Sequence, residues 1–163
     1  MTSVTFEPQL VRLVVNGEER TGVAEPRLLL VDFIRHELEL TGTHVGCEQG
    51  MCGACTIVLN GAVVRSCILF AVQAEGAHVE TIESVANGSR LHPIQQVFRE
   101  KHGLQCGFCT PGFILTTRAL LAEHPDPSDQ EIREYLAGNI CRCTGYVNIV
   151  DSVREAAARL RAS

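Results

Sequence analysis

Eight cysteines, arranged as two groups of four, are the residues of this 163-residue sequence best suited to chemistry. The first group is Cys47, Cys52, Cys55 and Cys67, and the second is Cys106, Cys109, Cys141 and Cys143. The first has the spacing C-x4-C-x2-C followed by a more distant cysteine, which is the pattern of plant-type 2Fe–2S ferredoxins. The second, C-x2-C-x31-C-x-C, is another complete set of four thiolates. The spacing therefore predicts two 2Fe–2S clusters with these eight cysteines as ligands.

Glycines accompany both groups, as expected where the backbone must approach a charged cluster. Four thiolates and two sulfides concentrate negative charge, which backbone N–H donors have to offset. Gly46, Gly50 and Gly53 would let the first loop fold tightly around its cluster. Gly107 and Gly112 could serve the second group in the same way.

Other uses of eight cysteines compete with this prediction. Disulfides suit an even number of cysteines, but they are rare in reducing compartments. Structural zinc suits the two C-x2-C pairs, although it would leave Cys47 without an obvious role. Covalent haem needs His directly after C-x2-C, where this sequence has Thr56 and Thr110. The Rieske and bacterial two-cluster ferredoxin patterns are both missing, so two all-cysteine 2Fe–2S clusters are the preferred hypothesis.

The composition is that of an ordinary globular protein, with 45% hydrophobic residues, 20% charged residues and a formal net charge of -5. The sequence has no cluster of Lys and Arg that would bind a nucleic-acid backbone, so nucleic acid is not an expected partner. No apolar stretch approaches the roughly 20 residues needed to span a bilayer, and the N-terminus lacks the features of a signal peptide. We therefore expect a cytoplasmic protein without membrane insertion, in a compartment where clustered cysteines usually bind metal.

Turn signals and hydrophobic periodicity outline the first half of the chain. Asn16-Gly17 and Asn60-Gly61 predict two hairpins. The run 28–38 is mostly apolar and lacks Gly and Pro, which predicts a packed helix. The expected strands are 11–15, 19–23, 56–59, 62–66 and 79–82. A strand pair, a helix and further strands make the β-grasp order of small ferredoxins.

The composition changes at 83–89, which predicts a linker, and every later signal is helical. Ser128 and Glu131 form a capping box, and Asn148 is placed to cap the last helix. The expected helices are 93–101, 111–123, 128–138 and 148–160.

The predicted fold class is therefore α+β. An N-terminal β-grasp domain of the plant-type 2Fe–2S ferredoxin kind is expected over residues 1–83. An all-α four-helix-bundle domain, holding the second 2Fe–2S cluster, is expected over residues 84–163.

Three motifs carry a resemblance to a known family. GTHVGCEQGMCGACT at 42–56, QCGFCTPG at 105–112 and GNICRCTGY at 138–146 contain all eight cysteines. They resemble the iron–sulfur small subunit of the xanthine oxidase family of molybdenum hydroxylases, which includes aerobic carbon monoxide dehydrogenase. The resemblance extends from about Val11 to Leu160, and it implies the same two domains in the same order.

The resemblance also implies a role for each group of cysteines. The second group matches the cluster nearest the molybdenum cofactor, and the first group matches the plant-type cluster nearer the flavin. Gln105 matches the glutamine whose side chain touches the pterin. Without the resemblance, Gln105 would be taken as an ordinary polar residue before a helix.

An electron-transfer subunit without a catalytic residue or a substrate site of its own is what the resemblance implies. Such a subunit would relay electrons from a molybdenum–pterin centre on a large partner to FAD on a medium subunit, or to another acceptor. The implied assembly is a heterotrimer, with further dimerisation left open. A free-standing ferredoxin and a zinc-stabilised interaction module are the alternatives.

Overall fold

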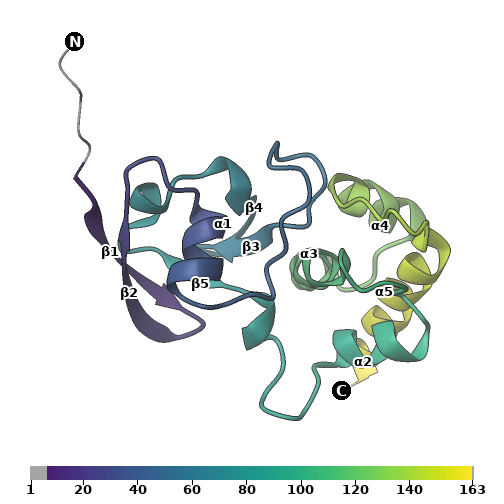
Figure 1. Ribbon diagram of the computed structural model, residues 1–163. Helices are drawn as coiled ribbons and strands as arrows, with labels where there is room; N and C mark the ends of the chain where they lie inside the picture. The colour runs from purple at the N-terminus through teal and green to yellow at the C-terminus, as the bar shows by residue number, and fades with distance from the viewer. Residues whose placement is uncertain (1–6, 163) are drawn as a thin grey trace.

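The computed structural model describes residues 7–162, which form a mixed sheet at one end of the molecule and a group of helices at the other (Figure 1). We call residues 7–83 the sheet half and residues 84–162 the helical half. Each half has its own hydrophobic core.

The sheet half begins with a hairpin of β1 (Gln9–Val15) and β2 (Glu18–Ala24), as predicted. Asn16 and Gly17 both have positive φ in the turn between them, which suits the right-handed twist of the two strands. Alternate residues of β1, from Val11 onward, are buried against the sheet's core. The period-2 pattern of the sequence therefore matches the observed strand.

The sheet has five strands in the order β2-β1-β5-β3-β4. β3 (Thr56–Leu59) and β4 (Ala62–Arg65) form the second predicted hairpin, and β5 (His78–Glu80) pairs in parallel with β1. β5 is shorter than the predicted strand 79–82. The backbone N–H of Thr81 donates to the side chain of Asn16 instead of extending the ladder.

The predicted helix over 28–38 is also shorter than expected. Its regular part is α1 (Leu30–Asp32), which continues as a π-helical turn over Phe33–Glu37. Leu30 and Phe33 are fully buried in the core of the sheet half, so the apolar run serves packing as predicted.

The helical half consists of four α-helices, and the predicted helices correspond to them. Their bounds are α2 (Pro93–Glu100), α3 (Thr110–Glu123), α4 (Asp129–Tyr135) and α5 (Tyr146–Ala162). Their shared core includes Phe98, Phe113, Ile132 and Ile149. α3 packs against β3 and β4 as well as against α2 and α4, so it joins the two halves (Figure 1).

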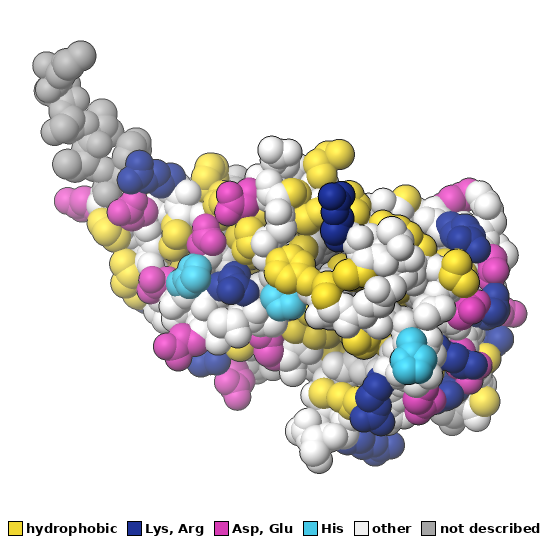
Figure 2. Space-filling model, turned by 45° about the vertical axis from the view of Figure 1, so that its right-hand side comes forward, with side chains coloured by type: hydrophobic (Ala, Val, Ile, Leu, Met, Phe, Trp, Pro, Cys, Tyr) yellow, Lys and Arg dark blue, Asp and Glu magenta, His cyan; other side chains and the backbone are white. Residues whose placement is uncertain are grey.

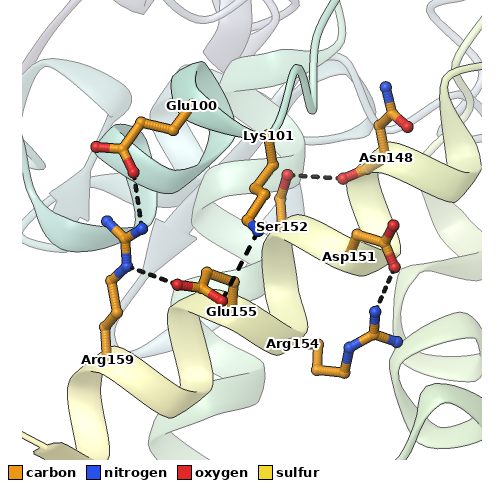
Figure 3. A network of polar contacts seen from close by, with 8 residues as sticks. All are labelled: Glu100, Lys101, Asn148, Asp151, Ser152, Arg154, Glu155 and Arg159. Atoms are coloured by element: carbon orange, nitrogen blue, oxygen red, sulfur yellow. Dashed lines mark hydrogen bonds and ion pairs between the residues drawn. The ribbon is translucent and has the colours of Figure 1, made fainter.

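The starts of the last two helices differ in how well local signals predicted them. α4 has the expected capping box of Ser128 and Glu131. The prediction that Asn148 caps α5 is wrong, because the helix already begins at Tyr146. The Asn148 side chain donates to the carbonyl of His102. The backbone carbonyl of Asn148 accepts from the Ser152 hydroxyl, as Figure 3 shows.

Ion pairs link the outer surfaces of α2 and α5 (Figure 3). Arg159 on α5 contacts Glu100 on α2 at 2.7 Å and Glu155 on its own helix at 2.9 Å. These side chains are partly exposed to water, which screens the charges, so each pair contributes little to stability. None of the helices within residues 7–162 is both long and apolar enough to cross a membrane.

Candidate metal centres

The first cysteine group is assembled by one loop and one hairpin. Cys47 and Cys52 lie in the loop that precedes β3, and Cys55 ends that loop. Cys67 follows β4, and the antiparallel pairing of β3 with β4 returns it to the side of Cys55. The Ser66 N–H donates to the carbonyl of Cys55 at 3.2 Å, which holds the two cysteines together. The sequence separation of Cys67 is thus explained by the length of the hairpin.

Backbone N–H groups point at the sulfur of Cys47. Gln49 and Cys52 each donate to its Sγ at 3.4 Å. These donors stabilise a thiolate, and they lower the pKa of Cys47 to about 7. Gly46 lies so close to the site that a Cβ atom there would be 3.0 Å from the Sγ of Cys52. The loop is therefore built to surround charged sulfurs with its own backbone.

The other cysteines of this group are harder to ionise as free thiols. Burial raises the pKa of Cys55 to about 11, and burial also raises the pKa of Cys52. The Cys67 side chain raises the pKa of Cys55 further, which shows how close the two sulfurs lie. Bound iron would reverse this effect, because a coordinating thiol is deprotonated by the metal's charge.

The second group is formed by two loops, one directly before α3 and the other directly before α5. Cys109 directly precedes α3, and Cys141 and Cys143 lie in the loop after α4. Cys106 is exposed, whereas Cys141 is buried. The Phe108 N–H and then the Cys143 side chain lower the pKa of Cys106, while burial and then the Cys141 side chain raise that of Cys109, so the four sulfurs lie near one another. All four predicted ligands are thus brought together.

Burial and backbone donors act on this second group as they do on the first. Burial raises the pKa of Cys109 to about 12, and the Phe108 N–H lowers that of Cys106. The Gly145 N–H donates to the Sγ of Cys141 at 3.4 Å. The donor chemistry of both groups fits a 2Fe–2S cluster, which is held by four thiolates and tuned by hydrogen bonds to sulfur.

All eight cysteines are free thiols in the structure. Within residues 7–162, no three or more His, Cys, Asp or Glu side chains are arranged as ligands of a single metal ion. A 2Fe–2S cluster does not require three ligands around one ion, because it divides its four thiolates between two irons.

One cysteine from each group lines a shared cavity of about 290 Å³. Cys52 of the first group and Cys109 of the second both line it, together with Ile140 and Arg142. The Ile140 N–H donates to the carbonyl of Cys52 at 2.9 Å. The ligand loops of the two halves are therefore in direct contact, which sequence reasoning had not anticipated.

Two side chains outside the predicted ligand set also join the loops. His44 stacks on Phe108 of the other half. Asn139 is only 3% exposed and bonds to the carbonyl of Gly53. Both residues lie inside the motifs quoted above, and this position was the sequence signal that could have identified them as part of the site.

Gln105 lies on the surface beside Cys106. A Cβ atom on Gly145 would be 3.8 Å from the Gln105 amide nitrogen and equally far from the Sγ of Cys141, so the amide lies close to the second group. Large hydrophobic side chains are exposed in the same two loops and at the start of α5. They are Leu104, Phe108, Ile140, Tyr146 and Val147. Figure 2 shows hydrophobic side chains gathered in the middle of the molecule's face, with charged side chains mostly toward its ends.

Two family models match the chain. The model described as "2Fe-2S iron-sulfur cluster binding domain" matches residues 13–84, and the one described as "[2Fe-2S] binding domain" matches residues 81–154. The first contains one cysteine group and the second contains the other.

Known proteins resemble the chain over nearly its whole length. The caffeine dehydrogenase subunit gamma of Pseudomonas sp. (strain CBB1) is 54% identical over 149 residues, which are 90% of this chain and 89% of that protein. The crystal structure of quinoline 2-oxidoreductase from Pseudomonas putida 86 matches with a TM-score of 0.88 and 49% identity, over 93% of this chain and 97% of that one.

A third match places the same fold inside a much longer chain. The aldehyde oxidoreductase of Desulfovibrio desulfuricans has a TM-score of 0.90 and 46% identity, over 94% of this chain but only 17% of its own. The cysteine groups, the family models and these relatives agree. The chain belongs to the iron–sulfur small subunits of the xanthine oxidase family of molybdenum hydroxylases, and it is a non-catalytic, electron-transfer subunit of an oxidoreductase.

Proposed function

We propose that this chain relays single electrons from a molybdenum–pterin centre on a large partner subunit to FAD or another acceptor. The observation that carries the proposal is the shared cavity, because one cysteine from each group of four lines it. Each 2Fe–2S cluster, when bound, accepts and releases one electron at a time. The first group would hold one cluster and the second group the other.

The chain's own residues determine the surroundings of each cluster. The N–H groups of Gln49 and Cys52 offset negative charge on Cys47, and that of Gly145 does so on Cys141. Hydrogen bonds to sulfur and exclusion of water set a cluster's potential. Cys47 and Cys141 differ in burial and in their number of N–H donors, so we expect the two clusters to have different potentials.

The two halves would be separate domains. We propose a β-grasp ferredoxin domain over residues 1–83 and a four-helix-bundle domain over 84–163. The sheet order with its packed helix supports the first, and the common core of α2 to α5 supports the second.

The second group would face the large subunit, and the first group would lie nearer the flavin. Exposed Phe108, Ile140 and Val147 support this orientation, because exposed apolar side chains close to a site often mark a protein interface. Gln105 would contact the pterin, since its amide is exposed beside Cys106.

The proposed partners are a large molybdenum-cofactor subunit and a medium FAD subunit, in a heterotrimer. A relative that is 49% identical over 143 residues is named as subunit beta of the 6-hydroxypseudooxynicotine dehydrogenase complex. In the aldehyde oxidoreductase, the matching region is part of a far longer chain, which supports a large partner. We place the complex in the cytoplasm, without nucleic acid or membrane insertion, because reducing compartments favour thiolate–metal sites.

The test is purification of the chain from its native host together with its partners. We expect about four iron and four sulfide per chain, and two distinguishable paramagnetic signals after reduction. A large molybdenum-containing subunit should co-purify. Stoichiometric zinc without sulfide would support a zinc module, and a chain purified without partners would support a mobile ferredoxin.

A further inference from the structure

Three polar side chains join the two halves between the cysteine groups. We call Thr56, Arg65 and Asn139 the clamp. Arg65 donates to the Thr56 hydroxyl at 2.5 Å and to the carbonyl of Gly138 at 2.8 Å. The Asn139 amide donates to the carbonyl of Gly53 at 3.2 Å. Sheet-half residues therefore bond to helical-half residues in both directions.

Two members of the clamp are buried, Arg65 is half-buried, and their hydrogen bonds are shared. Thr56 is 1% exposed and Asn139 is 3% exposed. The Asn139 oxygen accepts from Thr116 at 3.1 Å, and the Thr56 hydroxyl donates to Gly53 at 2.6 Å. A buried polar network of this kind is satisfied in only one relative placement of the two halves, because any displacement would leave polar groups unpaired.

Every member of the clamp lies within two residues of a cysteine ligand. Thr56 follows Cys55 directly, and Arg65 is two residues before Cys67. Asn139 is two residues before Cys141. A displacement at the clamp would therefore be passed directly to the ligands of both groups.

The backbones at the clamp approach too closely for side chains to separate them. Gly53 has φ +73°, and a Cβ atom there would lie 2.6 Å from the carbonyl oxygen of Gly138. A Cβ atom on Gly112 would overlap the carbonyl oxygen of Gly53. The two halves therefore meet glycine to glycine beside the clamp, where neither glycine has room for a Cβ atom.

We propose that Thr56, Arg65 and Asn139 are positioning residues, which fix the distance between the two cluster sites and thereby the rate of electron transfer between them. The inference rests on the proposed function. A single electron leaves one cluster and is gained by the other, with no bond or proton exchanged. The probability of electron tunnelling falls exponentially with distance, so a small change in the placement of the halves has a large effect on the rate.

The test compares variants in the assembled complex with both clusters present. Thr56→Val removes the hydroxyl at nearly constant shape, and Arg65→Gln removes the three bonds that the guanidinium donates to Thr56, Gly138 and Asn139. Thr56→Ser keeps the hydroxyl and is the conservative control. Arg118→Gln is the matched control, because Arg118 also joins the halves, through a 2.7 Å ion pair with Glu80, but lies in α3 away from the cysteine loops.

Three quantities are measured for each variant: iron content, the distance-dependent magnetic interaction between the two reduced clusters by paramagnetic resonance, and the rate of electron transfer between the clusters after rapid reduction. We expect Thr56→Val and Arg65→Gln to weaken the magnetic interaction and to slow the transfer severalfold at full iron content. Thr56→Ser and Arg118→Gln should match the wild type in both.

The proposal is overturned if fully loaded Thr56→Val and Arg65→Gln keep the wild-type interaction and rate, even where their thermal stability falls, since the residues would then be merely structural. An equal change in Arg118→Gln would also overturn it, because any contact between the halves would then have the same effect. A variant that loses its iron is replaced in the comparison by Asn139→Ala, to which the same outcomes apply. If the wild type itself lacks two clusters, it is the proposed function that fails.

Discussion

The imidazole of His44 stacks on the ring of Phe108, with centroids 4.7 Å apart and an interplanar angle of 20°. Its Nδ1 also lies 2.7 Å from the carbonyl oxygen of Phe108. His44 is three residues before Cys47, and Phe108 lies between Cys106 and Cys109. The contact therefore joins the two ligand loops directly.

Replacing His44 by Ala should destabilise this interface. A stacked pair of rings contributes about 1 kcal/mol beyond the area that it buries. For a chain of this size, that loss corresponds to a fall in unfolding temperature of about 2–4 °C, measured on the iron-loaded protein. His44→Phe keeps the stack and should retain most of the stability. If both variants unfold like the wild type, the stack contributes nothing.

Gly112→Ala should be far more disruptive than its size suggests. The added methyl group would overlap the carbonyl oxygen of Gly53, and neither backbone can move without displacing a cysteine loop. We expect a loss of roughly 1–3 kcal/mol or more in stability, as for other overpacked sites. Thermal unfolding and iron content would measure it.

Gly88→Ala is the control for this prediction. Gly88 has φ +57° and open space around its Cβ position, so the substitution adds backbone strain of about 1–2 kcal/mol without a clash. Both variants should fold, but only Gly112→Ala should also lose iron. Equal iron content in the two would contradict the close contact between Gly53 and Gly112.

The stability of the helical half should depend on pH through His92. His92 caps α2 by accepting the N–H of Ile94 on its Nδ1, so the cap needs a neutral imidazole. Burial lowers the pKa of His92, and the charge of Arg118 lowers it further. The unfolded chain therefore binds a proton near the ordinary value of 6.5 while the folded chain does not, and stability falls as the pH drops below 6.5.

His92→Asn should remove this dependence, because Asn is an effective N-cap that does not titrate. Unfolding temperatures of the two proteins, compared on either side of pH 6.5, would test it. A pH slope that survives the substitution would assign the effect to another group.

Gln105→Ala should slow electron entry from molybdenum and leave both clusters assembled. The exposed amide beside Cys106 is the proposed contact to the pterin, so its loss should reduce the rate at which substrate reduces the second cluster. Stopped-flow spectroscopy of the complex would measure that rate. Gln130→Ala, an exposed glutamine on α4, should have no effect. An unchanged rate in Gln105→Ala would rule out a functional pterin contact.

Substitution of single ligands should reveal the order of the two clusters. Cys106→Ser should stop substrate from reducing the plant-type cluster even where that cluster forms. In Cys47→Ser, substrate should still reduce the cluster of the helical half, while electrons fail to reach the flavin or external acceptor. Time-resolved reduction followed by paramagnetic resonance would distinguish the two clusters.

Each of these ligand variants needs an iron count and proof of an intact complex, because metal binding contributes to folding. Reduction of the plant-type cluster by substrate in an intact Cys106→Ser complex would show that the order is reversed, or that the clusters are reached in parallel.

Local sequence signals determined most of the elements. Asn16-Gly17 and Asn60-Gly61 predicted the two hairpins because only a few residue types tolerate positive φ at a two-residue turn. Ser128 and Glu131 predicted the start of α4 because the cap is made within four residues. The cysteine spacing indicated the triplet Cys47, Cys52 and Cys55 and the two close pairs of the second group for the same reason, since cluster ligands of one loop lie within a few residues of one another.

Local signals failed where a distant residue determined the outcome. Asn148 has the chemistry of a helix cap, but its side chain instead bonds to His102, which lies 46 residues earlier. β5 ends at Glu80 because the side chain of Asn16 takes the N–H of Thr81, 65 residues away. Neither partner is visible from the residues next to the element.

The placement of one cysteine group against the other depended on tertiary structure alone. The bond from Asn139 to Gly53 spans 86 residues, and the contact between Ile140 and Cys52 joins the same two loops. Spacing along the chain indicates which cysteines of one loop can share a cluster, because ligands within a loop are close by covalent connection. The meeting of Cys106 and Cys109 with Cys141 and Cys143, which lie beyond α3 and α4, depends on helix packing. The distance between the two sites arises from packing of α3 on the sheet and from glycine backbones in contact, neither of which has a local sequence pattern.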